Sequence, residues 1–445
     1  MDGILDDETW KTLPLKKDFI TYEPIYGEKL PYETLVWMTY DSKNLYFAFR
    51  CYDKETQKIK TWLTSRDRMW SDDWVGITLD SLGNKQTTYG FCINPNGIQG
   101  DLVESTSNPD DPSPDFVWES AGEVTSTGYQ VEICIPLKSI RFESGKNVEM
   151  EMMFRRKISR LGVKASWPEQ KAGQGVFNLL VPVRLKELKK PLKIEILPSI
   201  TRGSNRVRIQ PDKWNKSENF TEFGIGLKYG ITSSITADIT INPDFSQVEN
   251  DAFQVEINQR YLLFFKEKRS FFMEGMDIFN FYTLSNGFFT IPVHTRLIVD
   301  PAWGAKITGS QGKMSFGILS AGDQWPGQQD ALFGIARGKY SLGRDNYIGF
   351  LYSSRDFAGE YNRVLGVDFA YRPGKGQRFN ISLLHSLSGS QEGKEGEAPA
   401  SNNFNFYYNY DSTHYFILTT FEHIGTDFRM DTAYIVRNGI NNAAL

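Results

Sequence analysis

The residue types that most often perform chemistry are sparse in this sequence. The three cysteines, Cys51, Cys92 and Cys134, each lie in an apolar run without Cys-x-x-Cys spacing. An odd number in this arrangement argues against a disulfide scaffold and against a thiolate zinc site. All four histidines lie at position 294 or later, and neither a His-Glu-x-x-His motif nor a Gly-rich phosphate loop occurs. We therefore expect core thiols, and no histidine triad or nucleotide-phosphate site.

The block 264–275 combines phenylalanines with lysine and arginine. Such side chains together form stacking platforms for single-stranded nucleic acid. Glu267 and Glu274 oppose that use, and the chain has 50 Lys+Arg against 54 Asp+Glu, so no basic surplus is available for a phosphate backbone. We expect no nucleic-acid partner and interpret the segment 241–279 as a packed loop or plug.

The composition is that of a large protein rich in aromatic residues. The 445 residues suggest two or three domains, and 40% hydrophobic residues suffice for a sizeable core. Aromatic residues reach 14%, but no apolar run approaches the ~20 residues of a membrane helix. The first residues have no basic or apolar signal region, so either the protein is cytosolic or a signal peptide is trimmed or missing from this sequence; the resemblance described below favours the second expectation.

Residues 1–190 contain short apolar strands between charged turns. A hairpin is predicted from 34–40 and 45–52, with further strands at 74–79, 88–93, 128–135 and 148–155. This pattern is typical of a β-sandwich. The predicted core comprises Phe47, Phe49, Val75, Ile77, Leu79, Val131, Ile133 and Ile135.

The pattern changes after a basic, polar linker at 191–222, in which a first strand could begin at 194. From 223 to 445 the strands lengthen to about ten residues and alternate strictly, as expected for a transmembrane β-barrel. In 403–410, for example, Phe404 and Phe406 alternate with Asn403 and Asn405. A soluble antiparallel sheet or a β-helix remains an alternative interpretation of this periodicity.

Two motifs resemble a known family. The block 242–249, Asn-Pro-Asp-Phe-Ser-Gln-Val-Glu, and the block 264–275 resemble the signature of a bacterial, Bacteroidetes-type outer-membrane β-barrel family of unknown function. Its members carry an N-terminal domain similar to carbohydrate-binding module family 9. The N-terminal half agrees with such a module at 2–10, 44–47, 72–80 and 128–136. The resemblance implies a jelly-roll-like β-sandwich followed by an outer-membrane barrel.

The resemblance also implies a sugar site. Modules of this type hold sugar ends between two tryptophans, because the apolar face of a pyranose stacks on an indole while its hydroxyls need fixed polar partners. Trp70 and Trp167 match these positions, with Asn94 as a polar contact. Gly76 stands where the family has a glutamate, which removes one polar partner. Alternatively, both tryptophans cap the sandwich or face a partner domain.

Such modules often contain calcium, which takes several hard oxygen ligands. The loop 108–115 offers Asp110, Asp111 and Asp115 within six residues. A structural Ca²⁺ is one expectation for this loop, and an ordinary solvated loop is the other.

Catalysis has little support in the residues. Glycoside hydrolysis needs two carboxylates ~5–5.5 Å or ~6.5–9.5 Å apart. Asp72, Asp73 and Glu132 lie near strands, but a turn cap and an outward strand position account for Asp73 and Glu132. We assign no catalytic residue, although such modules often accompany glycoside hydrolases.

The strand pattern together with the resemblance thus implies an all-β outer-membrane protein that binds carbohydrate or docks at the cell envelope, in contact with membrane lipid and linked to glycan use (carbohydrate catabolism) or transport. The alternative is a secreted carbohydrate-active enzyme (an O-glycosyl hydrolase) or an adhesin. A last strand is predicted at 428–436, and the following residues lack the terminal aromatic of a barrel end. We therefore expect an incomplete, truncated barrel.

Overall fold

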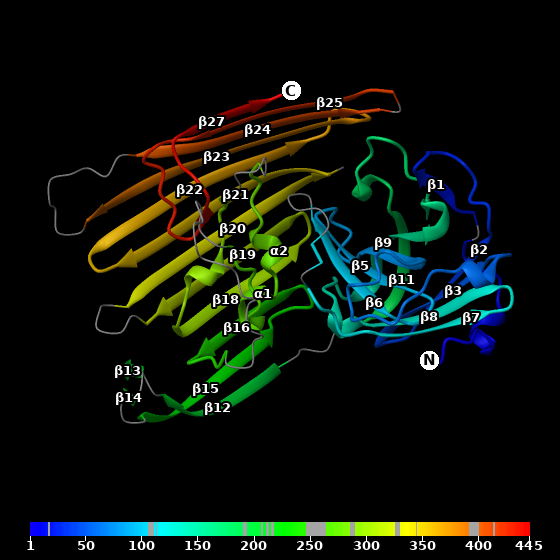
Figure 1. Ribbon diagram of the computed structural model, residues 1–445, viewed down its shortest axis with the longest axis horizontal. Coiled ribbons are helices and arrows are strands. Elements are labelled where there is room, and N and C mark those ends of the chain that lie inside the picture. Colours follow the sequence, from blue (N-terminus) through cyan, green and yellow to red (C-terminus); the bar gives the residue numbers. More distant parts are fainter. Residues whose placement is uncertain are drawn as a thin grey trace.

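Two β-rich parts follow one another along the chain and lie side by side (Figure 1). The computed structural model describes residues 1–445 except 17, 106–110, 113, 190–193, 206–207, 211–212, 215–217, 246–263, 285–289, 325–329, 344, 391–399 and 413, and every statement below concerns the described residues. Within these residues, no helix has the length and apolar character needed to cross a membrane.

The N-terminal part is a sandwich of two antiparallel sheets. The first sheet has seven strands in the order β1-β10-β9-β4-β5-β6, with β11 also pairing with β9; their bounds are β1 Ile20–Glu23, β4 Trp74–Asp80, β5 Thr87–Ile93, β6 Gln99–Ser105, β9 Gly145–Ile158, β10 Val163–Trp167 and β11 Val181–Leu188. The second sheet has the order β2-β3-β8-β7, with β2 Thr34–Tyr40, β3 Asn44–Tyr52, β7 Glu119–Thr125 and β8 Gly128–Pro136.

One hydrophobic core lies between these sheets. It contains all eight core residues predicted from the sequence: Phe47, Phe49, Val75, Ile77, Leu79, Val131, Ile133 and Ile135. Alternation in the strands explains this, because every second side chain points to the same side of a sheet. The predicted β-sandwich is confirmed.

The C-terminal part is a 12-stranded antiparallel sheet in which each strand pairs with its neighbours in chain order. Its strands are β12 Ile194–Asn205, β15 Glu218–Gly230, β16 Ile235–Ile241, β18 Pro301–Gln311, β19 Met314–Asp323, β20 Ala331–Gly343, β21 Asn346–Phe357, β22 Glu360–Tyr371, β23 Gln377–Ser390, β24 Ser401–Asp411, β25 Phe416–Ile424 and β27 Ile440–Ala444. The sheet curves like a barrel wall, and β12 and β27 are its edges among the described strands (Figure 1).

Short elements complete the described structure. The helices are α1 Ser270–Met273 and α2 Met276–Phe279, and the short strands are β13 Arg208–Gln210, β14 Lys213–Trp214, β17 Thr290–Ile291 and β26 Tyr434–Ile435. Single 3-10 turns occur at η1 Glu8–Lys11, η2 Thr56–Lys58, η3 Leu137–Ser139, η4 Ser159–Leu161, η5 Val176–Asn178 and η6 Thr295–Leu297.

The segment that carries α1 and α2 packs against the inner side of the large sheet. Phe271, Phe272 and Phe279 share one buried cluster with Phe333 and Leu351, which belong to β20 and β21. This agrees with the packed loop or plug expected for 241–279, although 246–263 lies outside the described residues. The predicted all-β fold, a sandwich followed by a barrel-like sheet, is therefore confirmed.

Two segments differ from the sequence expectation. The large sheet begins at Ile194, where the sequence allowed a first strand over 194–200 within the linker, but β12 continues to Asn205 and pairs with β15 over its whole length, so much of the predicted linker 191–222 belongs to the sheet. The single strand predicted at 428–436 is wrong, because Phe428 and Met430 turn inward into the buried cluster and only Tyr434–Ile435 is extended, paired with β17. The edge strand that pairs with β25 is instead β27.

The sandwich contacts one end of the large sheet. The Arg141 guanidinium donates to Thr308 Oγ1 at 2.8 Å, and the Gly376 N–H donates to the Gly173 carbonyl at 3.1 Å. A substitution at Gly173 would place a Cβ against the backbone of Gly376, and its φ of +70° also favours glycine. The two parts are thus in direct backbone contact.

Candidate functional site

The outer face of the seven-stranded sheet of the sandwich is turned toward the large sheet. On β4, the side chains of Val75, Ile77 and Leu79 enter the core, so Gly76 and Thr78 lie on the opposite face. Strand pairing extends this face sideways: Arg155 on β9 lies opposite Gly76, and Glu104 on β6 lies opposite Thr88 of β5. Charged side chains are therefore fixed on a rigid sheet rather than on loops.

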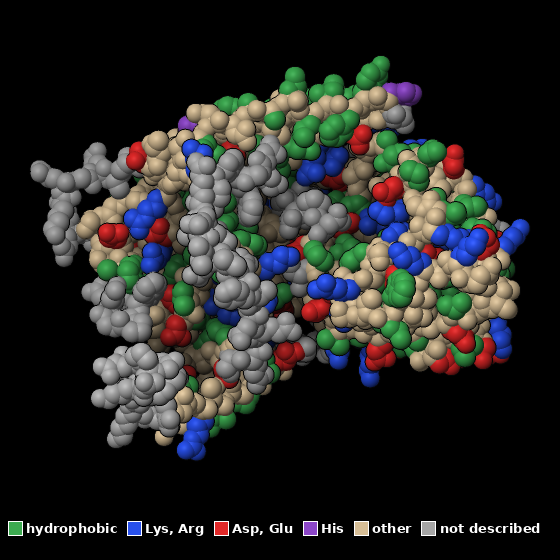
Figure 2. Space-filling view, in the orientation of Figure 1, with side chains coloured by type: hydrophobic (Ala, Val, Ile, Leu, Met, Phe, Trp, Pro, Cys, Tyr) green, Lys and Arg blue, Asp and Glu red, His purple; other side chains and the backbone are tan. Residues whose placement is uncertain are grey.

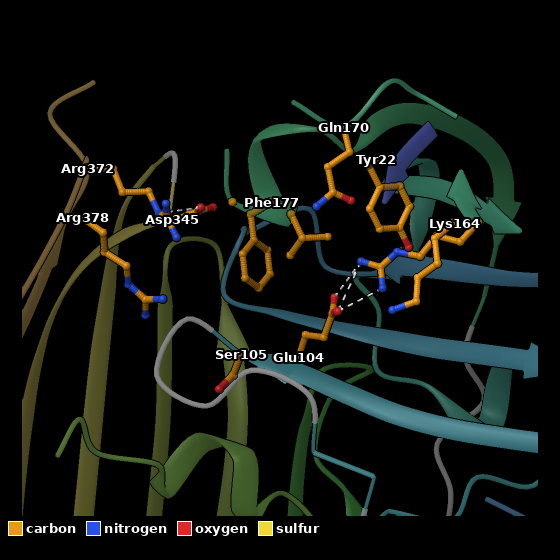
Figure 3. A pocket seen from close by; sticks show the side chains of 12 residues that line it. Tyr22, Glu104, Ser105, Lys164, Gln170, Phe177, Asp345, Arg372 and Arg378 are labelled. Carbon is orange, nitrogen blue, oxygen red and sulfur yellow. Dashed lines mark hydrogen bonds and ion pairs between the residues drawn. The ribbon is translucent and has the colours of Figure 1, made fainter. Parts of the chain in front are cut away.

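A cavity of about 320 Å³ lies between this face and the large sheet (Figure 3). The sandwich contributes most of its wall, through Tyr22, Glu104, Ser105, Arg155, Lys164, Gln170, Gly175, Val176 and Phe177. The large sheet contributes Asp345, Arg372 and Arg378. Its volume lies at the lower end of the range for small-molecule sites.

Ion pairs hold the charged walls in place. Arg155 Nη1 lies 3.1 Å from Glu104 Oε1, and Thr88 Oγ1 donates to Glu104 Oε2 at 3.2 Å. Across the cavity, Arg372 Nε lies 3.1 Å from Asp345 Oδ2. An Arg–carboxylate pair offers both hydrogen-bond donors and acceptors in a fixed plane. Each of these two pairs can therefore bind the hydroxyls of a ligand.

Two buried polar atoms of the lining retain hydrogen-bonding capacity. Arg155 Nε and Asp345 Oδ1 make no hydrogen bond to protein within the described part of the chain. Burial raises the pKa of Tyr22 to about 12, so its hydroxyl stays protonated and its ring stays neutral. Since buried polar groups almost always have partners, the cavity is suited to water or to a polar ligand.

The two tryptophans predicted from the sequence do not face each other. Trp70 packs edge-on against Trp74, with ring centroids 6.1 Å apart, in a small cluster on the outer face of the seven-stranded sheet. Trp167 stacks on Phe154 at 6.0 Å, on the core side of that sheet, and Lys16 Nζ lies 4.0 Å from its ring centre. A sugar ring cannot lie between both indoles in this arrangement.

Asn94 is fully buried, and its amide is occupied by the protein. Its Nδ2 donates to Asp72 Oδ2 at 3.0 Å and to the Trp62 carbonyl at 3.1 Å, and its Oδ1 accepts from the Ile98 N–H at 2.8 Å. Asn94 therefore fixes the segment that leads to Trp70 and does not lie on the surface. At Gly76, where the resemblance implied a glutamate, the Cys92 thiol fills the space that a side chain would need.

The predicted calcium ligands are only partly described. Asp110 lies outside the described residues. Asp115 Oδ1 lies 3.2 Å from Arg66 Nε, and the backbone of Asp111 pairs with Val103. In the part of the chain that the structure describes, no three His, Cys, Asp or Glu side chains gather as a metal site. Calcium at this loop remains a prediction.

The cavity residues were not identified from the sequence. Glu104 and Arg155 are 51 positions apart, and Arg372 comes from the other part of the chain. Glu104 lies in the strand Gln99–Ser105, which also contains Gln99, Asp101 and Ser105, so its charge does not single it out in the sequence. The sequence also does not show which residue of a distant strand lies opposite Glu104.

Comparisons with known proteins agree with the two-part organisation. Residues 1–167 match the family described as carbohydrate family 9 binding domain-like, and residues 190–289 match the domain of unknown function DUF5916. A search of the curated proteins gave no match.

A search of the solved structures gave matches of low sequence identity and low TM-score. A Bacteroides uniformis protein assigned to carbohydrate binding is 11% identical, with a TM-score of 0.32, covering 38% of this chain and 85% of its own. Salmonella typhi OmpF is 10% identical, with a TM-score of 0.31 and coverages of 92% and 98%. Pseudomonas aeruginosa OccK7 is 9% identical, with a TM-score of 0.24 and coverages of 84% and 68%. Residues 1–167 of the chain are thus similar to the carbohydrate family 9 binding domain-like family, and residues 190–289 are similar to DUF5916.

Proposed function

We propose that this chain is an outer-membrane β-barrel protein whose N-terminal sandwich binds carbohydrate. The observation that carries the membrane assignment is the reversed polarity of the large sheet. On β22, Leu365 and Val367 point outward with 46% and 50% of their surface exposed, whereas the neighbouring Asp368 points inward and is buried. Soluble sheets show the opposite arrangement.

The same reversal recurs around the sheet. Exposed outward residues include Ile225, Leu227, Ile239, Ile307, Ile318, Ile348, Phe350, Ile381, Leu383, Ile417 and Phe421. Buried inward residues include Lys306, Arg337, Lys339, Asn380, Asn403, Asn405 and Glu422. Hydrophobic side chains project along the edge of the sheet over β24, β25 and β27 (Figure 2). An apolar outside and a polar inside are what a lipid-embedded barrel requires.

The carbohydrate assignment rests on the family match and on the cavity. Residues 1–167 match the carbohydrate family 9 binding domain-like family. The Tyr22 and Phe177 rings supply apolar surface for a sugar face, and the Glu104–Arg155 pair supplies an acceptor and donors for hydroxyls. We therefore place the sugar in this cavity, and expect Trp70, at one end of the same face, to make at most a peripheral contact.

Membrane insertion is tested with the full chain expressed behind a secretory signal. We expect the protein in the detergent-extracted outer-membrane fraction, and faster gel migration before heating than after it. Recovery as a detergent-free soluble monomer would contradict the proposal and favour the secreted enzyme or adhesin.

Sugar binding is tested by titration calorimetry of the full chain in detergent micelles against mono- and disaccharides. We expect Glu104→Gln to weaken binding at least tenfold. The control is Glu149→Gln, which alters the exposed ion pair with Arg184, 3.1 Å apart, elsewhere on the sandwich. Absence of binding by the unmodified chain to every sugar would overturn the carbohydrate assignment.

A further inference from the structure

The charged side chains that the sandwich contributes to the cavity are paired with one another or with a neighbour. Arg155 Nη1 lies 3.1 Å from Glu104 Oε1, and Lys164 Nζ lies 2.6 Å from Glu23 Oε2. Each positive charge on this wall therefore has a carboxylate beside it. A charged ligand would meet no unpaired counter-charge on this part of the described lining.

The wall that the large sheet contributes is balanced in a similar way. Arg372 Nε lies 3.1 Å from Asp345 Oδ2, and Arg378 also interacts with neighbouring residues. Figure 3 shows Arg378 on the large-sheet side of the cavity, away from the space between Tyr22 and Phe177. Bringing a charge into a partly buried site without a counter-charge is costly. The electrostatics of both walls therefore favour an uncharged ligand.

Uncharged polar groups of the lining remain available to such a ligand. The Tyr22 hydroxyl and the Gln170 amide point into the cavity (Figure 3), and neither makes a hydrogen bond to another residue that the structure describes. Arg155 Nε is a buried donor that likewise has no protein partner in the described structure. A hydroxyl, an amide and a guanidinium N–H at three positions suit a ligand that carries several hydroxyls.

The rings of Tyr22 and Phe177 add apolar surface beside these polar groups. A sugar ring has an apolar face and a periphery of hydroxyls, which matches this combination. We propose that the cavity binds an uncharged sugar ring between Tyr22 and Phe177, with Gln170 as its specificity-determining residue. The inference rests on the proposed carbohydrate function and names its ligand class, neutral sugars as opposed to uronates and amino sugars.

The large sheet positions the segment 168–178, which carries Gln170 and closes one side of the cavity. The Gly376 N–H donates to the Gly173 carbonyl at 3.1 Å, and Asn178 Nδ2 donates to Asp345 Oδ2 at 3.3 Å. Both acceptor–donor pairs join the sandwich to turns of the large sheet. The sugar site therefore needs both parts of the chain, although most of its lining comes from the sandwich.

Gly175 shows how closely this segment fits against the large sheet. A Cβ at Gly175 would overlap the Asp345 carboxylate, so any larger residue must displace the segment. Gly374, in a neighbouring turn of the large sheet, has open space around the position of a Cβ. These two glycines therefore form a matched pair for testing the role of the large sheet.

Titration calorimetry of the full chain in detergent micelles compares glucose and galactose with glucuronate, galacturonate and glucosamine. We expect the two uncharged sugars to bind at least tenfold more tightly than the three charged ones. Gln170→Glu should weaken glucose and galactose at least fivefold and shift the preference toward glucosamine, because the added carboxylate can pair with its ammonium group. Gln174→Glu, in the same segment but outside the described lining, is the matched control and should bind like the unmodified chain.

The contribution of the large sheet is measured with the same titrations. We expect Gly175→Ala to weaken glucose and galactose at least fivefold, because the segment that carries Gln170 is displaced, and Gly374→Ala to leave binding unchanged. Gln170→Glu carries the test if Gly175→Ala does not fold.

Equal binding of uncharged and charged sugars, or equal effects of Gln170→Glu and Gln174→Glu, would overturn the inference while leaving the proposed function intact. Unchanged binding by a folded Gly175→Ala would overturn the positioning role of the large sheet. If no sugar binds to the unmodified chain, both the inference and the carbohydrate assignment fail.

Discussion

Arg337 on β20 and Asp368 on β22 form a fully buried ion pair on the inner side of the large sheet, with Nη1–Oδ1 and Nη2–Oδ2 distances of 2.7 and 2.8 Å. Tyr347 donates to the same carboxylate at 2.9 Å, and Arg337 Nε donates to the Asn280 carbonyl at 3.2 Å. The pair therefore joins the sheet to the segment that packs inside it.

Removing one partner of this pair should destabilise the protein strongly. Asp368→Asn leaves Arg337 buried without its counter-charge, and we expect a loss of about 3–5 kcal/mol in the free energy of unfolding. Asp356→Asn breaks a half-exposed pair with Arg363 and should cost less than about 1 kcal/mol. Denaturant unfolding in detergent micelles measures both. Similar losses for the two variants would contradict a structural role for the interior pair.

A charge on the outer surface of the large sheet distinguishes a membrane barrel from a soluble one. Leu383, in the middle of β23, and Val124, on β7 of the sandwich, are 40% and 41% exposed. We expect Leu383→Lys to cost about 2–4 kcal/mol in a bilayer, because its ammonium group would enter lipid. Val124→Lys should change stability by no more than about 0.5 kcal/mol. Equal, small effects in proteoliposomes would argue for a soluble sheet.

Lowering the pH should increase the free energy of unfolding of the sandwich, because Asp80 is protonated in the folded state. Burial raises the pKa of Asp80 to about 6, well above that of a solvent-exposed aspartate, so between about pH 4 and pH 6 the folded state holds a proton that the unfolded state has released. Stability therefore rises as the pH falls from about 6 to about 4, by at most about 3 kcal/mol for this group. Asp80→Asn should remove this portion of the pH dependence, as measured by tryptophan fluorescence during urea unfolding at pH 7 and pH 5. If Asp80→Asn and the unmodified protein showed the same pH dependence of stability, Asp80 would not titrate in this range.

Glu132 should hold the N-terminal segment on the sandwich. Its carboxylate accepts from Trp10 Nε1 at 2.8 Å and from the Gly3 N–H at 3.1 Å. We expect Glu132→Ala to cost about 1–3 kcal/mol, because two buried donors lose their acceptor, and to speed hydrogen exchange over residues 2–10. Glu123→Ala, at an exposed position of β7, serves as the control and should leave exchange unchanged. If hydrogen exchange over residues 2–10 were as slow in Glu132→Ala as in the unmodified protein, this role would be contradicted.

The hairpin at 34–52 is an element that the local sequence pattern predicts correctly. Its two strands were predicted within one residue, because the turn residues Asp41-Ser42-Lys43-Asn44 and alternating apolar side chains specify a hairpin without help from the rest of the chain. The strand predicted at 428–436 failed for the complementary reason. Phe428 and Met430 alternate as in a strand, but they pack into a cluster built from distant elements.

The sequence by itself determined the all-β class, the change from a sandwich to a barrel-like sheet and the membership of the sandwich core, because strand periodicity and turn residues are local properties. Only the tertiary structure decided the site. It placed Trp70 and Trp167 on opposite faces of one sheet and brought Glu104 and Arg155 to within 3.1 Å, with Arg372 and Arg378 across the cavity. Local pattern shows which side chains share a face, whereas the packing of sheets from distant segments decides what lies opposite them.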